Sequence, residues 1–164
     1  MVNISAGDYI QGAQLTTEIK SASDSTTKIG DVCSVQSTVW KTCPTSASQG
    51  PYRVAVSGSN YTSTGASTIQ TADTSFSALV DGFVYVTADG VINPGDLVTP
   101  IGATTAGRVI TYVVNGAPTA ATASSEWRLP CGVYEGHANE GSVAAVPTAA
   151  AQGDIIRIRF RGQV

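Results

Sequence analysis

The stretch TADGVINPGDLVTP (87–100) decides how this chain can fold. Pro94 presets φ near −65° at the second position of a turn, and Gly95 accepts the positive φ that a type II turn requires at the third. Asp96 follows, with a carboxylate placed to accept a backbone N–H and hold the turn closed. Leu97 and Val98 then begin a strand. The stretch therefore predicts a tight turn that leads directly into a strand.

A Gly-Asp pair followed by apolar residues occurs four times, as GDYI (7–10), GDVC (30–33), GDLV (95–98) and GDII (153–156). The intervals differ, so we interpret the pair as a local device rather than as a solenoid repeat. Ala88-Asp89-Gly90 is interpreted in the same way, as a turn after a strand. The residues predicted to form turns are Asp89, Gly90, Pro94, Gly95, Asp96, Gly153 and Asp154.

Short runs of β-branched and aromatic residues recur between turn signals. Such runs are typical of strands, and closely spaced short strands favour a compact all-β barrel or sandwich. Helical periodicity is scarce, and its best candidate is QTADTSFSALV (70–80). The predicted strands are YRVAV (52–56), GFVYVTA (82–88), GRVITYVV (107–114), CGVYEG (131–136) and DIIRIRF (154–160).

Length and composition narrow the class of protein. The 164 residues suffice for one domain with a real core, and only 13% of them are charged. We expect residues 1–50, rich in Ser and Thr, to form an N-terminal arm with a possible hairpin, and residues 51–164 to form the β domain. The net charge of −3 argues against nucleic-acid binding, which needs a dense basic face. No run of about 18 apolar residues is present, so no membrane span is expected.

Nothing in the sequence predicts catalysis. Asp89 and Asp96 have an alternative interpretation as an acid/base pair, but no neighbouring residues supply a pocket that shifts their pKa values. The single histidine, His137, lies between Glu135 and Glu140 without any nucleophile motif. We therefore expect no catalytic, cofactor or metal site, and no enzyme. A β-clip enzyme, with His137 and two carboxylates in a pocket, is the alternative.

The cysteines leave one question open. Cys33, Cys43 and Cys131 are an odd number and form no CxxC pair. A bridge between Cys33 and Cys43 across a hairpin is one alternative, and thiols in a reducing cell are the other, which we favour.

The C-terminal strand carries a basic stripe. In DIIRIRFRG (154–162), Ile156, Ile158 and Phe160 share one face, and the arginines share the other. The stripe either deters edge pairing or meets an acidic patch on a partner. The predicted partner contacts are Tyr9, Ile10, Arg157, Arg159 and Arg161.

The order of motifs resembles the head decoration, or capsid cement, proteins of tailed bacteriophages. The resemblance rests on turn and strand patterns over about residues 78–162: VTADGVINPGDLVTP (86–100), GRVITYVV (107–114), CGVYEGHANEGS (131–142) and VPTAAAQGDIIRIRFRG (146–162). It implies a small β-barrel of the β-tulip or β-clip kind with an extended N-terminal arm, of which residues 1–20 are the candidate. It also implies a homotrimer that binds the major capsid protein on the capsid exterior of a virion and stabilises the expanded shell, without any cofactor.

A second class of function is compatible with the composition. A receptor- or glycan-binding surface module, such as the base of a head fibre, would present exposed aromatic side chains. The aromatic residues that would form such a cluster are Trp40, Tyr52 and Tyr61.

Overall fold

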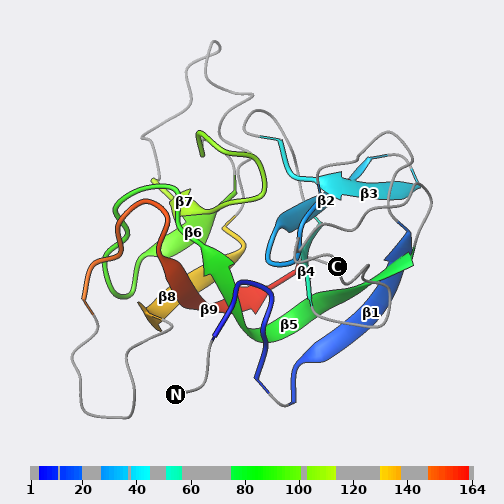
Figure 1. Ribbon diagram of the computed structural model, residues 1–164, viewed down its shortest axis with the longest axis horizontal. Helices are drawn as coiled ribbons and strands as arrows, with labels where there is room; N and C mark the ends of the chain where they lie inside the picture. The colour runs from blue at the N-terminus through cyan, green and yellow to red at the C-terminus, as the bar shows by residue number, and fades with distance from the viewer. Residues whose placement is uncertain are drawn as a thin grey trace.

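The computed structural model describes residues 4–10, 12–19, 27–36, 38–44, 51–56, 75–100, 103–113, 130–137 and 148–162. Within these residues the protein is all-β, and nine strands form one antiparallel sheet that curls into half a barrel (Figure 1). The strand order is β3-β2-β4-β5-β9-β8-β6-β7, with β1 also paired to β5. The strands are β1 (Gln14–Ile19), β2 (Val32–Gln36), β3 (Val39–Thr42), β4 (Tyr52–Ala55), β5 (Ser75–Thr87), β6 (Leu97–Thr99), β7 (Ile110–Thr111), β8 (Gly132–His137) and β9 (Ile155–Arg161).

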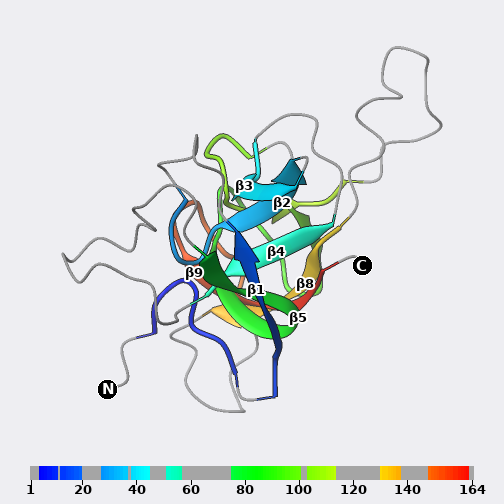
Figure 2. The same cartoon turned by 90° about the vertical axis from the view of Figure 1, so that its right-hand side faces the viewer.

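Strand β5 is the central strand of the sheet, because it pairs with three other strands. Along one edge it pairs with β1 and with Tyr9, which bridges to Val84. Along the other edge it pairs with β4 near its start and with β9 over Asp81–Thr87. Figure 1 accordingly shows β5 between one group made of β6 to β9 and another made of β1 to β4. Figure 2 shows the strong curl of β5, with β1 lying along it.

The stretch with the best helical periodicity, 70–80, is a strand where the structure describes it. Residues 75–80 are the first half of β5, and residues 70–74 lie outside the described ranges. Ala78 pairs with Thr16 of β1 on one edge and with Ala55 of β4 on the other. A short segment with few strong helix formers gains little from a helix, so pairing on both edges decides its structure.

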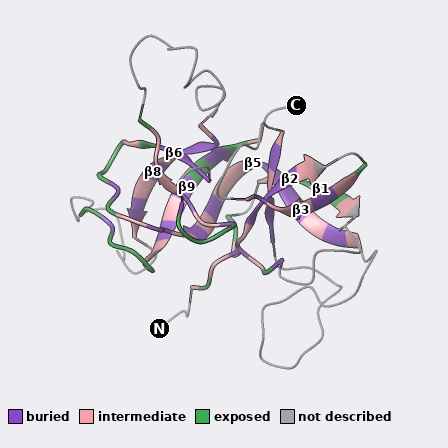
Figure 3. Ribbon diagram, turned by 90° about the horizontal axis from the view of Figure 1, so that it is seen from above, coloured by how far each residue is buried: buried purple, intermediate pink, exposed green. Residues whose placement is uncertain are grey.

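Two buried clusters form the core, and β5 contributes to both. Its first half gives Phe76 and Ala78 to a small cluster with Trp40, whereas Leu79, Val84 and Val86 belong to the main cluster. Figure 3 shows buried residues in both parts of the sheet. The face of β5 that points into the main cluster changes near Gly82, from the odd-numbered Leu79 to the even-numbered Val84 and Val86. At Gly82 φ is +135°, and an added Cβ would lie 2.8 Å from Ala13 Cβ. Leu79 before Gly82 and Val84 after it therefore both reach the main cluster, although they differ in their odd and even positions along the strand.

The N-terminal third is part of the same sheet. Strands β2 and β3 pair as an antiparallel hairpin, in which Val35 lies opposite Trp40. The segment expected to be an extended arm runs beside β5: Ile10 donates a backbone hydrogen bond to Phe83, and β1 continues the same edge. Strand β1 and the segment around Tyr9 therefore stabilise the sheet itself, because they cover one edge of β5, its longest strand.

All four Gly-Asp pairs form the same turn. Each glycine has a φ between 86° and 92°, and each aspartate N–H donates to the carbonyl three residues before it. The aspartate Oδ2 then accepts the N–H of that same residue, so the turn is closed by two hydrogen bonds. The carboxylate contacts join Asp8 to Ser5 (2.8 Å), Asp31 to Lys28 (2.8 Å), Asp96 to Asn93 (2.9 Å) and Asp154 to Ala151 (2.7 Å).

Each turn also enters the sheet through the same bulge. The glycine N–H donates to the carbonyl of one facing residue, and the N–H of that residue donates to the aspartate carbonyl. Two residues therefore oppose one, with glycine in the left-handed region, which is the G1 type of β-bulge. The facing residues are Tyr85 for Gly7, Ala55 for Gly30, Tyr134 for Gly95 and Ala88 for Gly153.

The turn glycines allow a direct test of backbone strain. Gly95→Ala places a Cβ in open space, so its only penalty is the positive φ, and we expect the free energy of unfolding to fall by about 1–2 kcal/mol. Gly30→Ala has the same φ penalty, and its Cβ would also lie 2.4 Å from Ala6 Cβ. We therefore expect Gly30→Ala to be clearly less stable than Gly95→Ala in urea denaturation.

Gly90→Ala is the matched control, because Gly90 is not among the glycines with positive φ and its added Cβ would lie 4.0 Å from the nearest atom. It should leave the urea midpoint close to that of the wild type. Equal stability of all three variants would contradict the turn geometry.

Candidate functional site

Strand β9 separates an apolar face from a basic one. Ile156, Ile158 and Phe160 are fully buried, as the alternation of the sequence predicts. Arg157 is partly buried, and Arg159 and Arg161 are exposed. The arginines thus lie on the face of the sheet that points away from the core.

Neighbouring strands add apolar side chains to this face. Arg159 pairs with Phe83 of β5 on one side and with Val133 of β8 on the other, and Val133 pairs with Leu97 of β6. Because directly opposite residues of antiparallel strands lie on the same face, these side chains form one row across the sheet. We call this surface the outer face; it comprises Asp81, Phe83, Tyr85, Leu97, Val133, Arg157, Arg159 and Arg161.

The guanidinium of Arg159 is placed against an aromatic ring. Its Cζ lies 6.0 Å from the centroid of the Phe83 ring, within the range of a cation–π contact. Such stacking restricts the side chain without using its N–H donors. Arg159 can therefore still bind a carboxylate.

The arginines of the outer face have no acidic partner among the described residues. The ion pairs found there join Arg53 to Glu18 (3.5 Å), Arg108 to Asp89 (3.6 Å) and His137 to Asp154 (3.7 Å). The Nε of Arg157 is buried, and none of the described residues forms a hydrogen bond with it. Three positive charges of a chain with net charge −3 are therefore gathered on one face. Arg161 has an acidic neighbour there, because Asp81 lies directly opposite it, whereas the residues opposite Arg157 and Arg159 are uncharged.

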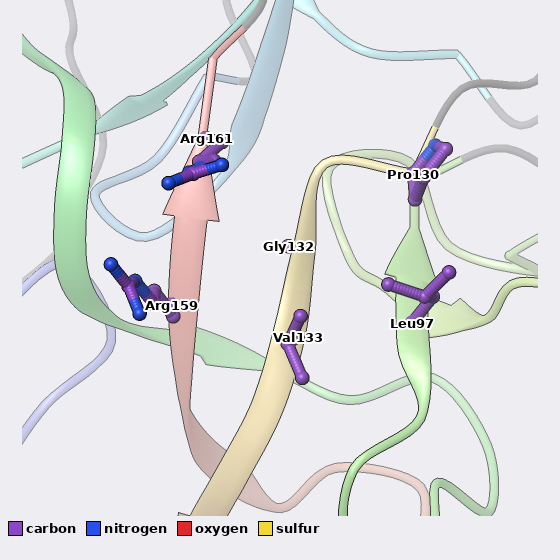
Figure 4. Close-up of a pocket in the computed structure, with 6 residues that line it drawn as sticks. All are labelled: Leu97, Pro130, Gly132, Val133, Arg159 and Arg161. Atoms are coloured by element: carbon purple, nitrogen blue, oxygen red, sulfur yellow. The ribbon is translucent and has the colours of Figure 1, made fainter.

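The outer face contains a hollow. It has a volume of about 350 Å³ and combines apolar and basic walls (Figure 4). Arg159 and Arg161 project from β9, while Val133 and Leu97 project from β8 and β6. The lining residues are Leu97, Pro130, Gly132, Val133, Arg159 and Arg161.

Two other predicted contacts, Tyr9 and Ile10, lie beside β5. Both are exposed, at 38% and 39%. The backbone N–H of Ile10 donates to the carbonyl of Phe83, so Ile10 lies next to Phe83 at the end of the row of side chains that crosses the outer face. Tyr9 pairs with Val84, whose side chain is buried in the core. Of the two, only Ile10 is thus placed in line with Arg159.

Asp89 differs from the other predicted turn residues. Its Oδ2 accepts hydrogen bonds from Thr104 N, Thr104 Oγ1 (2.7 Å) and Thr105 N (3.0 Å), fifteen residues and more along the chain. Its side chain is fully buried, and its Oδ1 lies 3.6 Å from Arg108. The chain bends at Asp89 and Gly90 after β5, but the Asp89 carboxylate holds a distant loop instead of closing its own turn as in the Gly-Asp pairs.

That loop joins the two ends of the curled sheet. Val109 N–H donates to Thr87, at the end of β5, and Asp89 N–H donates to Val109. Gly107 accepts from Val32 of β2 and donates to Cys43. Because Asp89 secures residues 104 and 105, it fixes the loop that makes these bridges.

The environment of Asp89 shifts its pKa. Burial of the carboxyl raises the pKa, whereas the hydrogen bonds from Thr104 and Thr105 lower it, and the net effect is a pKa below the ordinary value. The charged form is therefore the one that the fold stabilises.

The surroundings of His137 contain one described carboxylate. Its Nδ1 lies 3.7 Å from Asp154, whose Oδ2 already accepts the N–H of Ala151, and its ring meets that of Tyr134 edge-on. Glu140 lies outside the described residues. Among the described residues, no three His, Cys, Asp and Glu side chains gather in a way that would hold a metal ion.

The cysteines and the aromatic residues belong to the core. Cys33, Cys43 and Cys131 are all buried as thiols, and burial, together with the nearby Cys43, raises the pKa of Cys131. Trp40 is only 7% exposed, with the Arg53 guanidinium 5.0 Å from its ring centroid, and Tyr52 is fully buried. An aromatic cluster for glycan binding would need Trp40 and Tyr52 at the surface; Tyr61 lies outside the described residues.

Comparison with known proteins gave no match, either to a protein-family model or to a curated protein. In the ranges that the structure describes, no helix has the length and apolar character needed to cross a membrane.

The hydrogen bonds of Asp89 predict an acid-dependent loss of stability. We expect Asp89→Asn to lower the free energy of unfolding at pH 7 by about 1.5–3 kcal/mol, the range for hydrogen bonds to a charged group. Because the pKa of Asp89 is lowered in the folded state, its contribution is complete above the ordinary carboxyl pKa and is lost as the pH falls through the folded value. The difference between wild type and variant should therefore shrink below about pH 4.

Asp81→Asn is the control for this measurement, since Asp81 is an exposed aspartate of β5. Urea denaturation of both variants at several pH values distinguishes the two positions. A destabilisation by Asp89→Asn that stays constant down to pH 2 would contradict the assigned role of the carboxylate.

Proposed function

We propose that this protein is a non-enzymatic structural protein of a bacteriophage virion. It binds the exterior of the icosahedral capsid through the major capsid protein, as trimers at local three-fold axes, and stabilises the expanded shell. The proposal draws on the resemblance of residues 78–162 to head decoration proteins. The observation that carries it is the outer face, a sheet surface on which three arginines without an ion pair among the described residues lie beside Phe83, Val133 and Leu97.

The composition of the outer face suits contact with another protein. Aromatic residues and arginine are enriched in protein–protein interfaces, and arginine is a frequent hot-spot residue. The arginines are too few to neutralise a nucleic-acid backbone, and the net charge of −3 would oppose one. A protein surface that carries carboxylates is the partner that fits both features.

A protein of this kind needs contact area rather than chemistry. An interface of about 1,600 Å² is typical of specific complexes. A ligand present at about 100 times its dissociation constant, and bound only to the assembled state, adds roughly 2.7 kcal/mol per site. Trimeric placement multiplies this effect, because the second and third contacts form at a high effective concentration.

Co-sedimentation tests the proposed function. The purified chain is mixed with expanded, undecorated heads of the bacteriophage that encodes it, and with unexpanded heads as the control. We expect saturable binding to the expanded heads only, at three copies per local three-fold axis, and greater resistance of the decorated heads to heating. Absence of binding to heads of every maturation state would overturn the proposal.

The full chain is the appropriate reagent for this experiment. Removal of residues 1–20 would take away β1 and the segment around Tyr9, and so expose one edge of β5. A truncated protein that fails to bind would then report the loss of the sheet rather than the loss of an arm.

A further inference from the structure

The hollow on the outer face has two chemically different sides. Leu97, Pro130 and Val133 give it an apolar side, and Leu97 is 42% exposed. Arg159 and Arg161 line its other side; Figure 4 shows the guanidinium of Arg159 on the β5 side of β9, turned away from Val133 and Leu97. Its volume of about 350 Å³ falls at the lower end of the range of small-ligand sites.

The cationic side is prepared for a carboxylate. Neither Arg159 nor Arg161 forms an ion pair within the described residues, and of the two only Arg161 has an acidic residue, Asp81, directly opposite it. Arg159 is held over the Phe83 ring, which reduces the rotamer freedom that it would lose on binding. A guanidinium binds a carboxylate through two parallel N–H···O bonds, which gives this contact both strength and direction.

We infer that the hollow receives an apolar side chain of the partner whose neighbouring residue is an aspartate or a glutamate. The apolar side chain packs against Leu97 and Val133, and the carboxylate binds Arg159 and Arg161. This inference deepens the proposed function and rests on it for the identity of the partner, which would be an acidic, apolar segment of the capsid surface. It adds the place of contact and the chemistry of the segment.

Synthetic peptides test the hollow separately from the capsid. The probe is a short peptide in which Phe or Leu is followed by Glu-Glu, and the control peptide has Gln-Gln at the same positions. We expect saturable binding of the Glu peptide, measured by isothermal titration calorimetry, that weakens as salt is raised. The Gln peptide should bind roughly tenfold more weakly, which is the effect of one charge-assisted hydrogen bond. Equal binding of the two peptides would overturn the inference.

Variants assign the binding to the hollow. We expect Arg159→Ala and Leu97→Ser each to weaken binding of the Glu peptide roughly tenfold. Arg159→Lys keeps the charge but loses the planar fork, so its affinity should lie between those of wild type and Arg159→Ala. Lys28→Ala is the matched control, because it removes an exposed positive charge that does not line the hollow. Thermal unfolding of each variant checks that the sheet is intact; unchanged binding by a folded Arg159→Ala would overturn the inference.

The same variants on expanded heads separate the two proposals. If wild type and Arg159→Ala both decorate the heads, the proposed function stands and the inference fails. If the wild type binds the Glu peptide but no head, the hollow stands as a binding site and the proposed function fails. If the peptide instead drives apart dimers or trimers of the chain in analytical ultracentrifugation, the occupant is a second copy and the inference about the capsid partner is overturned.

Discussion

The closed Gly-Asp turn is the interaction on which the sheet depends. At four positions a glycine with positive φ allows the chain to reverse, and an aspartate carboxylate binds the N–H at the start of the turn. The glycine and aspartate then share one facing residue, which places a bulge at the start of the following segment. Because a bulge increases the local twist, four of them in one sheet help to explain why it curls instead of remaining flat.

The turns also determine which segments meet on β5. The turn at Gly7 is bonded to Tyr85, and the turn at Gly153 is bonded to Ala88, three residues further along. The first starts the segment that covers one edge of β5, and the second starts β9 on the other edge. The pairing on both edges of β5 is therefore fixed near the C-terminal end of that strand. The register of β9 against β5 places Phe83 opposite Arg159, and this pairing brings the side chains of the outer face together.

Core and outer face are two consequences of one alternation. Along β9 the even-numbered residues are buried, and three of the four odd-numbered ones are arginines, so the strand stabilises the fold with one side and leaves charge on the other. Internal ion pairs are used elsewhere, at Asp89 and Glu18, where they hold loops and strands together. The contrast between these ion pairs and the arginines of β9, which form none within the described residues, is the physical basis of the proposed docking surface.

The sequence by itself determined the local structure. Pro-Gly-Asp and Gly-Asp have few conformations open to them, so the turns at Asp96 and Asp154 were predictable, and so was the alternation in DIIRIRF. The tertiary structure alone decided what lies far apart along the chain. Residues 75–80 form a strand because β1 and β4 pair with them on both edges. The Asp89 carboxylate accepts hydrogen bonds from Thr104 because the tertiary fold brings that distant loop beside it. Strand order likewise decided that Leu97 and Val133 stand beside Arg159, since no local pattern encodes which strands become neighbours.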